Sequence, residues 1–418
     1  MICSPPQLRL NKCRKADCCV LRRWQLRSDI RERGLHIIGA RIMQVFYPTL
    51  LRAALILLAA LGGGREAVAV DSFTFTGNLL VARHNANAVL LNNGKVLVAG
   101  GIETYQPTDS AELYDPATGT FTATGNMVTT SLAGRTATLL PNGKVLIAGG
   151  LIGTDEYSDS AEIYDPATGS FAATAHMIWG RGYATATLLP NGKVLIAAGI
   201  ENYVGTAELY DPANGTFTSA GMMQSPRIGA TATLLPNGQV LIEGGFASAA
   251  PSAELYDPQT GSFTTTGNPT IGRYLETATL LQNGQVLVAG GENFDGGLLS
   301  EADIYDPDTG TFTATGSLNT ARLLATASLL PDGKVLIAGG ADVNNPDNSV
   351  ATAELYDPAT GKFTAAASMN IERQEATATV LPGGRVLVAG GDNNDDAPIF
   401  FAEIYTANVV YRSGFDGP

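Results

Sequence analysis

The stretch TATLLPNGKVLIAGG, residues 136–150, decides the fold because the chain repeats it. Seven close copies end at Gly101, Gly150, Gly199, Gly245, Gly291, Gly340 and Gly391. Successive copies end 46 to 51 residues apart, and so regular a spacing is typical of proteins built from tandem structural repeats. The copies define seven units, numbered 1 to 7 along the chain.

Each unit predicts four short β-strands. In unit 2, residues 136–140 alternate between polar and apolar, the tight turn Pro-Asn-Gly follows, and residues 144–148 are a run rich in β-branched side chains. Beyond a loop of variable length, residues 160–165 (SAEIYD) and 170–174 (SFAAT) predict two further strands joined by the turn DPATG. Four-stranded units at even spacing predict an all-β fold, a seven-bladed β-propeller, because radial repetition leaves few exposed sheet edges.

The two ends of the repeat region predict how the propeller closes. Unit 7 has no DPxTG turn after Tyr405, whereas an unassigned strand, residues 72–77 (SFTFTG), precedes unit 1. We therefore expect this N-terminal strand to complete the blade of unit 7 and to close the ring. The alternative is that the C-terminal segment, residues 409–415 (VVYRSGF), takes that place.

The double glycine of the second strand and the downstream pattern Y-D-P-x-T-G-x-F resemble the kelch repeat. The form ATATLLPNGKVLIAGG is similar to the kelch modules of galactose-oxidase-like propellers and their bacterial relatives. The resemblance covers residues 72–405 and implies four-stranded, kelch-type blades. Kelch propellers include enzymes, substrate adaptors and actin-binding proteins, so the resemblance implies a fold and no single function.

The resemblance also raises the question of a copper site, which in galactose oxidase uses two histidines, two tyrosines and a cysteine cross-linked to one of them. Residues 70–418 contain His84, His176 and no cysteine. We therefore expect no cofactor and no metal, and we expect both histidines at the surface or in loops. Residues 392–403 match the spacing of a calcium loop, but Ala397 replaces the required glycine, so a solvated acidic loop is favoured.

The N-terminal part of the chain differs from the repeats and predicts export. Residues 1–42 are basic and contain all four cysteines, and we expect them to precede the true start at Met43. Residues 43–69 have the layout of a signal peptide, with Arg52, a run of nine apolar residues and a final Ala-Val-Ala cleavage motif. That run is shorter than the ~20 residues that span a bilayer, and an uncleaved anchor is the alternative. Residues 70–418 then form a single propeller domain that is extracellular, periplasmic or on the cell surface, with no membrane insertion.

The charge of the chain excludes several classes of partner. The net charge is −13, but residues 1–69 carry 12 Lys and Arg against 4 Asp and Glu, so residues 70–418 have a net charge of −21. Phosphate backbones and anionic lipids repel so acidic a body. We expect no nucleic-acid partner, and we expect a monomer that binds a protein or a polysaccharide.

An arginine recurs ten positions before the residue that forms the hairpin turn of each unit. Six of the seven units have it: Arg83, Arg181, Arg227, Arg273, Arg322 and Arg373. An acidic residue recurs early in the third strand of every unit: Glu112, Glu162, Glu208, Glu254, Asp303, Glu354 and Glu403. One arginine and one carboxylate per unit favour a structural ion pair. The alternative is a ring of arginines at the channel mouth that binds carboxylates of a ligand.

Departures from the repeat mark the candidate ligand-binding residues. Unit 2 has Leu132 where the arginine belongs, and it has Arg135 where most units have alanine; unit 5 has Glu276 at that alanine position. Aromatic residues accompany the arginines of units 3 and 5, which suits peptide or sugar recognition, although aromatics that seal gaps between loops fit equally well. The candidates are Arg135, Trp179, Arg181, Tyr183, Tyr203, Arg227, Arg273, Tyr274 and Glu276.

Together these observations predict a secreted, non-catalytic kelch propeller that binds a protein or polysaccharide. The predicted binding face carries the loops between the second and third strands, because those loops vary most in length and sequence. The alternative is a carbohydrate-active hydrolase or lyase that uses paired carboxylates on the same face, where acids are abundant and no pair stands out. No G-x-S-x-G, Walker or dinucleotide motif points to another enzyme class, so we assign no catalytic residue.

Overall fold

The computed structural model describes residues 71–104, 106–153, 156–199, 205–246, 252–342, 345–394 and 397–407. The basic segment 1–42, the predicted signal peptide 43–69, Tyr203 and the C-terminal segment 409–415 lie outside the described residues. The described residues form strands, turns and loops without any helix, and hence without a helix of the length and hydropathy that a membrane span requires. The expected all-β fold is confirmed.

The units form a series of antiparallel sheets, and each sheet has four strands in the order of the chain. Unit 1 contains β2 (Asn87–Leu90), β3 (Val96–Ala99), β6 (Ala111–Asp115) and β7 (Thr120–Ala123). Unit 2 contains β8 (Ala133–Leu139), β9 (Val145–Gly153), β11 (Ala161–Asp165) and β12 (Ser170–Ala173). Unit 3 contains β13 (Ala184–Leu188), β14 (Val194–Ala198), β15 (Thr206–Asp211) and β16 (Thr216–Met222). Unit 4 contains β17 (Ile228–Leu234), β18 (Val240–Phe246), β19 (Ala253–Asp257) and β20 (Ser262–Thr265).

The last three units follow the same order, except that the fourth strand of unit 7 comes from the other end of the chain. Unit 5 contains β21 (Thr277–Leu280), β22 (Val286–Ala289), β23 (Ala302–Asp306) and β24 (Thr311–Ala314). Unit 6 contains β26 (Thr326–Leu329), β27 (Val335–Ala338), β30 (Ala353–Asp357) and β31 (Lys362–Ala365). Unit 7 contains β32 (Thr377–Val380), β33 (Val386–Ala389), β34 (Ala402–Thr406) and β1 (Ser72–Phe75).

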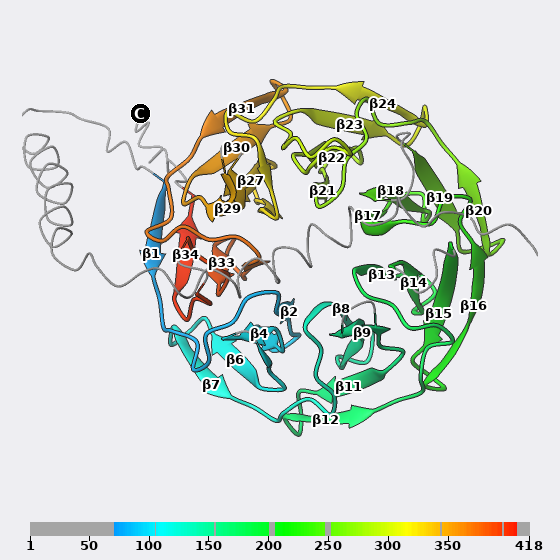
Figure 1. The fold of residues 1–418 in the computed structure, drawn as a ribbon, viewed down its shortest axis with the longest axis vertical. Coiled ribbons are helices and arrows are strands. Elements are labelled where there is room, and N and C mark those ends of the chain that lie inside the picture. The colour runs from blue at the N-terminus through cyan, green and yellow to red at the C-terminus, as the bar shows by residue number, and fades with distance from the viewer. Residues whose placement is uncertain are drawn as a thin grey trace, which may run out of the picture. The chain divides into compact units, whose positions relative to one another are not determined.

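Strand β1 takes the place of the strand that the sequence of unit 7 lacks. It pairs antiparallel with β34, with Phe73 opposite Tyr405. The ring centroids of these two residues are 5.0 Å apart, close to the 4.8 Å between Tyr114 and Phe121, which occupy the same positions in unit 1. Figure 1 shows the sheets around a common centre, with the first strands β2, β8, β13, β17 and β21 inside and β1, β7, β12, β16, β20, β24 and β31 outside.

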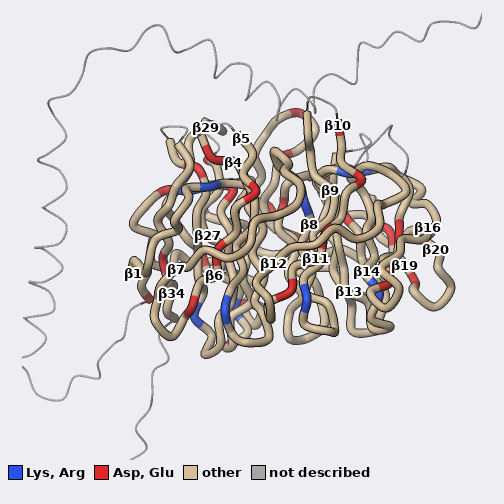
Figure 2. Tube along the Cα trace, turned by 90° about the horizontal axis from the view of Figure 1, so that it is seen from below, with Lys and Arg blue, Asp and Glu red and all other residues tan. Residues whose placement is uncertain are grey.

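Short additional strands lie mainly in the loops that follow the double glycines. They are β4 (Ile102–Glu103), β5 (Gln106–Pro107), β10 (Glu156–Tyr157), β28 (Ala341–Asp342) and β29 (Asn345–Ser349), while β25 (Arg322–Leu323) pairs with β28. Figure 2 shows β4, β5, β10 and β29 at one edge of the sheets. We call this edge, with the loops that follow the double glycines and those that lead into each first strand, the variable-loop face.

The turns at the opposite edge are uniform because each is built from the same local hydrogen bonds. In unit 2, Asn142 Oδ1 accepts the backbone N–H of Lys144 at 3.1 Å, and Gly143 N–H donates to the carbonyl of Leu140 at 2.9 Å. In unit 1, Asp115 Oδ1 accepts the N–H of Ala117 at 2.9 Å. Asn and Asp favour turns because their short side chains can hold the backbone in this way.

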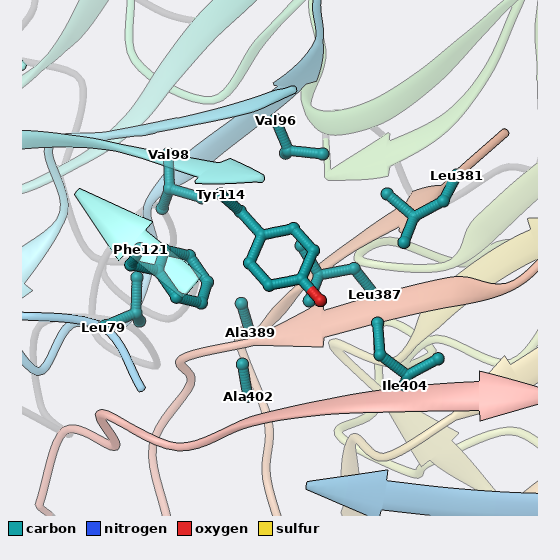
Figure 3. Close-up of a cluster of buried hydrophobic side chains, with 10 residues drawn as sticks. All are labelled: Leu79, Val96, Val98, Tyr114, Phe121, Leu381, Leu387, Ala389, Ala402 and Ile404. Atoms are coloured by element: carbon teal, nitrogen blue, oxygen red, sulfur yellow. The ribbon is translucent and has the colours of Figure 1, made fainter. Parts of the chain in front are cut away.

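The hydrophobic core lies between neighbouring sheets. Among the described residues, seven buried clusters each combine side chains of two adjacent units. In the cluster between units 7 and 1, Tyr114 and Phe121 meet Leu381, Leu387 and Ile404 (Figure 3). Because each second strand is covered on both faces, it reads as a continuous apolar run such as VLIA. Each fully buried Val or Leu side chain stabilises the fold by about 1.5–3 kcal/mol.

The second glycine of the double glycine is required by two constraints at once. Gly101 has a φ of +96°, and a Cβ there would lie 2.5 Å from the carbonyl oxygen of His84. Gly94 in the hairpin turn has a φ of +80°, but the nearest atom to a Cβ would be 4.0 Å away. An alanine at either position would therefore have a strained backbone, and only an alanine at position 101 would also clash with neighbouring backbone atoms.

We expect Gly94→Ala to lower the free energy of unfolding by about 1–2 kcal/mol, the cost of a left-handed conformation for a residue with a Cβ. Gly101→Ala should cost clearly more, because the strand that carries His84 must also move. Chemical denaturation of both variants measures the difference. Equal losses of unfolding free energy in the two variants would show that the close backbone contact at Gly101 does not affect stability.

Candidate functional site

The six repeated arginines are buried, and each pairs with the acid in the third strand of its own unit. The N–O distances are 2.8 Å for Arg83–Glu112, 2.9 Å for Arg181–Glu208, 3.2 Å for Arg227–Glu254, 3.1 Å for Arg273–Asp303, 2.8 Å for Arg322–Glu354 and 2.7 Å for Arg373–Glu403. The favoured prediction, a structural ion pair in each unit, is confirmed for these six. Their charges are balanced inside the protein rather than presented to a ligand.

Each ion pair also holds a loop in place. In unit 1, Arg83 Nη1 donates to the carbonyl oxygen of Gly100 at 2.8 Å. Glu112 accepts the backbone N–H groups of Leu80 and Val81 at 2.7 and 3.0 Å. The pair therefore joins the loop that leads into the first strand to the ends of the second and third strands. Breaking such a buried pair leaves an uncompensated charge, which typically costs about 3–5 kcal/mol.

Unit 2 keeps the ion pair although its arginine has moved in the sequence. Leu132 stands at the usual position, and Arg135, three residues later, places its Nη1 2.8 Å from Glu162 Oε1. Ser131 and Thr129 accept the remaining guanidinium N–H groups at 2.7 and 2.6 Å. Arg135 borders the axial cavity described next, but its guanidinium serves the same structural contact as the arginines of the other units.

A cavity of about 330 Å³ lies where the first strands of all seven units converge. It is lined by two successive residues of each unit, eight and seven positions before the hairpin-turn residue. The residues at the first of these positions are Asn85, Gly134, Tyr183, Gly229, Leu275, Leu324 and Glu375. This cavity, which we call the axial cavity, lies where the loops of the variable-loop face lead into the first strands.

All seven of these residues have left-handed backbone conformations, with φ between +53° and +70°. Within the described residues, six backbone hydrogen bonds link each to the equivalent residue of the preceding unit: Asn85 to Glu375, Tyr183 to Gly134, Gly229 to Tyr183, Leu275 to Gly229, Leu324 to Leu275 and Glu375 to Leu324. The donor–acceptor distances are 2.9 to 3.4 Å. Five of the seven residues are not glycine, and strain of this kind in non-glycine residues concentrates at functional sites.

A polar cluster occupies the wall of the axial cavity at the junction of units 7 and 1. Glu375 Oε2 lies 2.6 Å from His84 Nδ1 and accepts a hydrogen bond from Asn85 Nδ2 at 2.7 Å. His84 lies in the loop between β1 and β2, as the expectation of a surface or loop position allowed, and it is buried there. His176 is exposed as expected, with Nδ1 2.9 Å from Asp159.

A second acidic cluster lies in the wall between units 4 and 5. Glu276 lines the axial cavity and is only 8% exposed, and Glu243 behind it on β18 is fully buried. The two carboxyls are close enough to share a proton, and Thr231 Oγ1 donates to Glu243 Oε1 at 2.7 Å. Burial raises the pKa of Glu276 well above its ordinary value, and the charge of Glu243 raises it further. Burial likewise raises the pKa of Glu243.

The aromatic candidates have different surroundings. Trp179 is 45% exposed beside the loop that leads into unit 3, and Tyr183 lines the axial cavity, where burial raises its pKa. Tyr274 is buried, and its ring stacks on Phe294 with centroids 6.4 Å apart, while Phe246 meets it edge-on at 5.7 Å. Tyr274 thus seals the gap between the loops of units 4 and 5, the alternative that the sequence left open.

The structure brings together three of the sequence-predicted residues, Arg135, Tyr183 and Glu276, at the axial cavity. It also adds residues that the sequence reasoning missed, above all Glu243 and Glu375. Glu243 replaces the alanine that precedes the double glycine in the other six units, a departure visible in the sequence. Glu375 lies in a column that has five different residue types in seven units, and that variation close to the repeated arginine was the available signal.

The residues present do not fit the copper site of galactose oxidase. Residues 70–418 contain no cysteine, and His84 and His176 already contact Glu375 and Asp159. In the part of the chain that the structure describes, no three His, Cys, Asp or Glu side chains gather as metal ligands would. The candidate calcium loop loses its last ligand because Glu403 pairs with Arg373.

Comparison with known proteins supports the fold and gives no activity. The kelch motif matches residues 83–128 and 134–177. The structure is similar to that of a fungal alcohol oxidase of the AA5 family in complex with copper, with a TM-score of 0.67 and 20% sequence identity over 81% of this chain and 76% of that chain. At that identity the likeness shows the fold alone. Among the curated proteins, none matches the chain.

The displaced arginine of unit 2 gives a direct test of the ion-pair assignment. We expect Arg135→Ala to lower the free energy of unfolding by about 3–5 kcal/mol, because Glu162 would lose its buried partner. Adding Leu132→Arg should restore most of the loss, because the guanidinium then comes from the position that the other six units use. Thermal and chemical unfolding of the single and double variants measure both effects. A double variant as unstable as Arg135→Ala would refute the equivalence of the two positions.

Proposed function

Because this chain belongs to the kelch-repeat propellers, we propose that residues 72–406 form a closed ring of seven blades that binds a polysaccharide at its axial cavity without chemically changing it. Three contacts between the two ends of residues 72–406 support the ring. These are the pairing of β1 with β34, the shared hydrophobic cluster of Figure 3, and the hydrogen bond from Asn85 N–H to the carbonyl of Glu375.

One observation carries the proposal: the axial cavity is lined by a column of the repeat in which the residue type varies between units. The three positions that follow are nearly constant, mostly alanine, threonine and alanine, whereas this column contributes Asn85, Tyr183, Leu275, Leu324 and Glu375 to the cavity lining. A concave site with mixed apolar walls and a few polar groups is the usual form of a ligand site. A volume of about 330 Å³ is at the lower end of such sites, which suits one sugar residue of a longer chain.

The chemistry of the lining favours a sugar over an anionic ligand. Glu375 and the amide of Asn85 offer hydrogen-bonding groups, and Tyr183 offers an aromatic face with a polar end. Trp179 on the variable-loop face is exposed and can contact a neighbouring sugar residue. The net charge of −21 on residues 70–418 disfavours acidic ligands and nucleic acids.

A second candidate function, a hydrolase or lyase, is favoured by one observation. Glu276 lines the axial cavity with a raised pKa, as a general acid would. Binding without turnover stands first because the partner carboxyl, Glu243, is fully buried behind Glu276 and cannot reach a substrate. The export signal predicted at 43–69 completes the proposal, which places the monomeric propeller outside the cell.

Replacing cavity side chains tests the binding site without disturbing the fold. Tyr183→Gly and Leu324→Gly introduce the residue that units 2 and 4 already have in this column, and both relieve a positive φ. We expect each to weaken polysaccharide binding about ten-fold or more, as loss of a buried contact residue does. A glycan array followed by calorimetry on the best glycan measures this, with the exposed outer-strand variant Thr264→Ala as control.

Binding that is unchanged in both cavity variants would overturn the axial cavity as the site. Release of shortened or unsaturated glycan products by the purified protein, abolished by Glu276→Gln, would instead favour the hydrolase or lyase.

Export is tested separately from binding. We expect the secreted protein to begin at or near Val70, because cleavage follows the Ala-Val-Ala motif. N-terminal sequencing of protein recovered from outside the cytoplasm checks this. A start well before Val70 would refute the cleavage site.

A further inference from the structure

Unit 1 departs from the repeat in the wall of the axial cavity. Six positions before the hairpin-turn residue, the other six units have threonine, whereas unit 1 has Asn87, the first residue of β2. Of the seven residues at this position, all of which the structure describes, Asn87 alone lines the axial cavity. The cavity thus borders a carboxamide side chain that has no counterpart at this position in the other units.

The threonines at this position serve the scaffold. All six hydroxyl groups donate hydrogen bonds to the second strand of their own unit, five of them to a backbone carbonyl at 3.1 to 3.4 Å. Thr277, for example, donates to the carbonyl of the alanine that lies opposite it on β22. Asn87 lies opposite an alanine too, Ala99 on β3. A threonine at position 87 would therefore find the same acceptor, so the scaffold does not require an asparagine there.

The side chain of Asn87 is accessible and has no partner in the protein. Within the described residues its amide makes no hydrogen bond, and neither of its polar atoms is sealed from solvent, because the side chain is only half-buried. In the same part of the chain, the hydroxyl of Tyr183 is also accessible and without a partner. Inside proteins such groups usually have partners. The axial cavity therefore offers polar groups that a ligand can reach and satisfy.

Neighbouring residues give the cavity a fixed shape around these polar groups. The ring of Tyr183 packs on Gly134, where a Cβ would lie 3.0 Å from the tyrosine Cγ. The side chain of Leu275 packs in the same way on Gly229, where a Cβ would lie 3.2 Å from it. Glu375, held by the contacts described above, keeps 17% of its side chain exposed. A ligand therefore meets side chains that are already in position, which lowers the entropy cost of binding.

The apolar part of the lining consists mainly of small side chains. Five units have alanine seven positions before the turn residue: Ala86, Ala184, Ala230, Ala325 and Ala376. A ligand group that matches this lining needs an acceptor and a donor for the amide of Asn87 and a small apolar part for the alanines. An acetamido group has a carbonyl, an N–H and a methyl group. A hydroxyl lacks the methyl group, and a carboxylate is repelled by Glu375.

We propose that the axial cavity binds an N-acetylated amino sugar, with the acetamido group hydrogen-bonded to the side chain of Asn87. The inference rests on the proposed function, because it names the sugar that the axial cavity takes. Asn87 donates to the acetamido carbonyl and accepts its N–H, while the methyl group packs on alanine. The sugar hydroxyls contact Glu375 and Tyr183. Burial and the charge of Glu375 raise the pKa of Tyr183, so its hydroxyl remains a donor.

Calorimetry with three sugar tetramers that differ only in the group at C2 tests the ligand class. The probes are the β-1,4-linked tetramers of N-acetylglucosamine, glucosamine and glucose. We expect the acetylated tetramer to bind about ten-fold tighter or more than either of the others, because a site built to pair a polar group rejects analogues that lack it. Because the acetamido group is uncharged, its affinity should change less than about two-fold between about 50 mM and about 500 mM salt, a range over which exposed ionic contacts are screened.

Variants at Asn87 separate a ligand role from a structural one. Asn87→Thr restores the threonine of the repeat, so its Tm should equal or exceed that of the wild type while the preference for the acetylated tetramer is lost. Asn87→Asp removes the donor and adds a negative charge, so it should favour the glucosamine tetramer, whose ammonium group pairs with a carboxylate. Asn78→Thr, the same replacement at an exposed residue outside the cavity, should change neither stability nor binding. A lower Tm for Asn87→Thr would assign the asparagine to the fold and overturn the site.

Four binding results would also overturn the acetamido site. Equal binding of the three tetramers, sensitive to Tyr183→Gly, would do so and leave polysaccharide binding intact. Tighter binding of the glucose or glucosamine tetramer by the wild type would do the same. So would binding of none of the three, with glycans that lack an acetamido group bound in a manner sensitive to Tyr183→Gly. Tighter binding of a peptide that carries N-acetyl-lysine, lost in Asn87→Thr, would assign the cavity to a protein ligand.

Failure of the proposed function itself has a different signature. Binding of the acetylated tetramer that is unchanged in Tyr183→Gly, Leu324→Gly and Asn87→Thr alike would place the glycan outside the axial cavity and refute both proposals.

Discussion

The buried contact between a guanidinium group and a carboxylate, made once in every unit, is the interaction on which the rest of the structure depends. A four-stranded sheet of this size cannot bury both of its faces alone, so it must be held beside its neighbours. The Arg83–Glu112 pair does this by accepting the backbone N–H groups of the incoming loop and by donating to the end of the second strand. Such a pair is costly to break because the remaining charge would stay buried without a partner, and its hydrogen bonds fix the orientation of both side chains. Unit 2 demonstrates the constraint, because its arginine changed position and the contact with Glu162 remained.

Once these loops are fixed, the residue that follows them has little conformational freedom. In six of the seven units, the backbone N–H of this residue donates to the carbonyl oxygen of the equivalent residue of the preceding unit. The backbone of this residue is left-handed in all seven units. Glycine adopts that conformation without strain, yet Tyr183, Leu275, Leu324 and Glu375 adopt it too. The ion pairs and the sheet packing offset the strain, and the result is a set of side chains held toward one cavity. The repeat is therefore constant where it builds the scaffold and variable where it meets the axial cavity.

The acidic pair at units 4 and 5 extends this division of roles. Glu243 and Glu276 occupy positions where the scaffold accepts alanine, and both are buried without a compensating cation of their own. The fold is similar to that of a copper oxidase, but residues 70–418 contain no cysteine, and their two histidines already contact carboxylates. The same scaffold thus carries a different chemical lining, which is the usual relation between fold and function.

The sequence by itself determined the repeat, its four-stranded units, the pairing of arginines with acids, and the two departures at Arg135 and Glu276. These are visible because strand alternation, turn chemistry and tandem repetition act over a few residues and leave periodic traces. Only the tertiary structure decided that Arg135 pairs with Glu162 while Glu276 is buried against Glu243, because that depends on which acid lies across the sheet. It alone joined Glu243 to Glu276 and placed Glu375 beside His84, pairs that are 33 and 291 residues apart. The left-handed column was equally hidden, since five of its seven residues are not glycine and six of the seven donate a hydrogen bond to the neighbouring unit, which the sequence does not reveal.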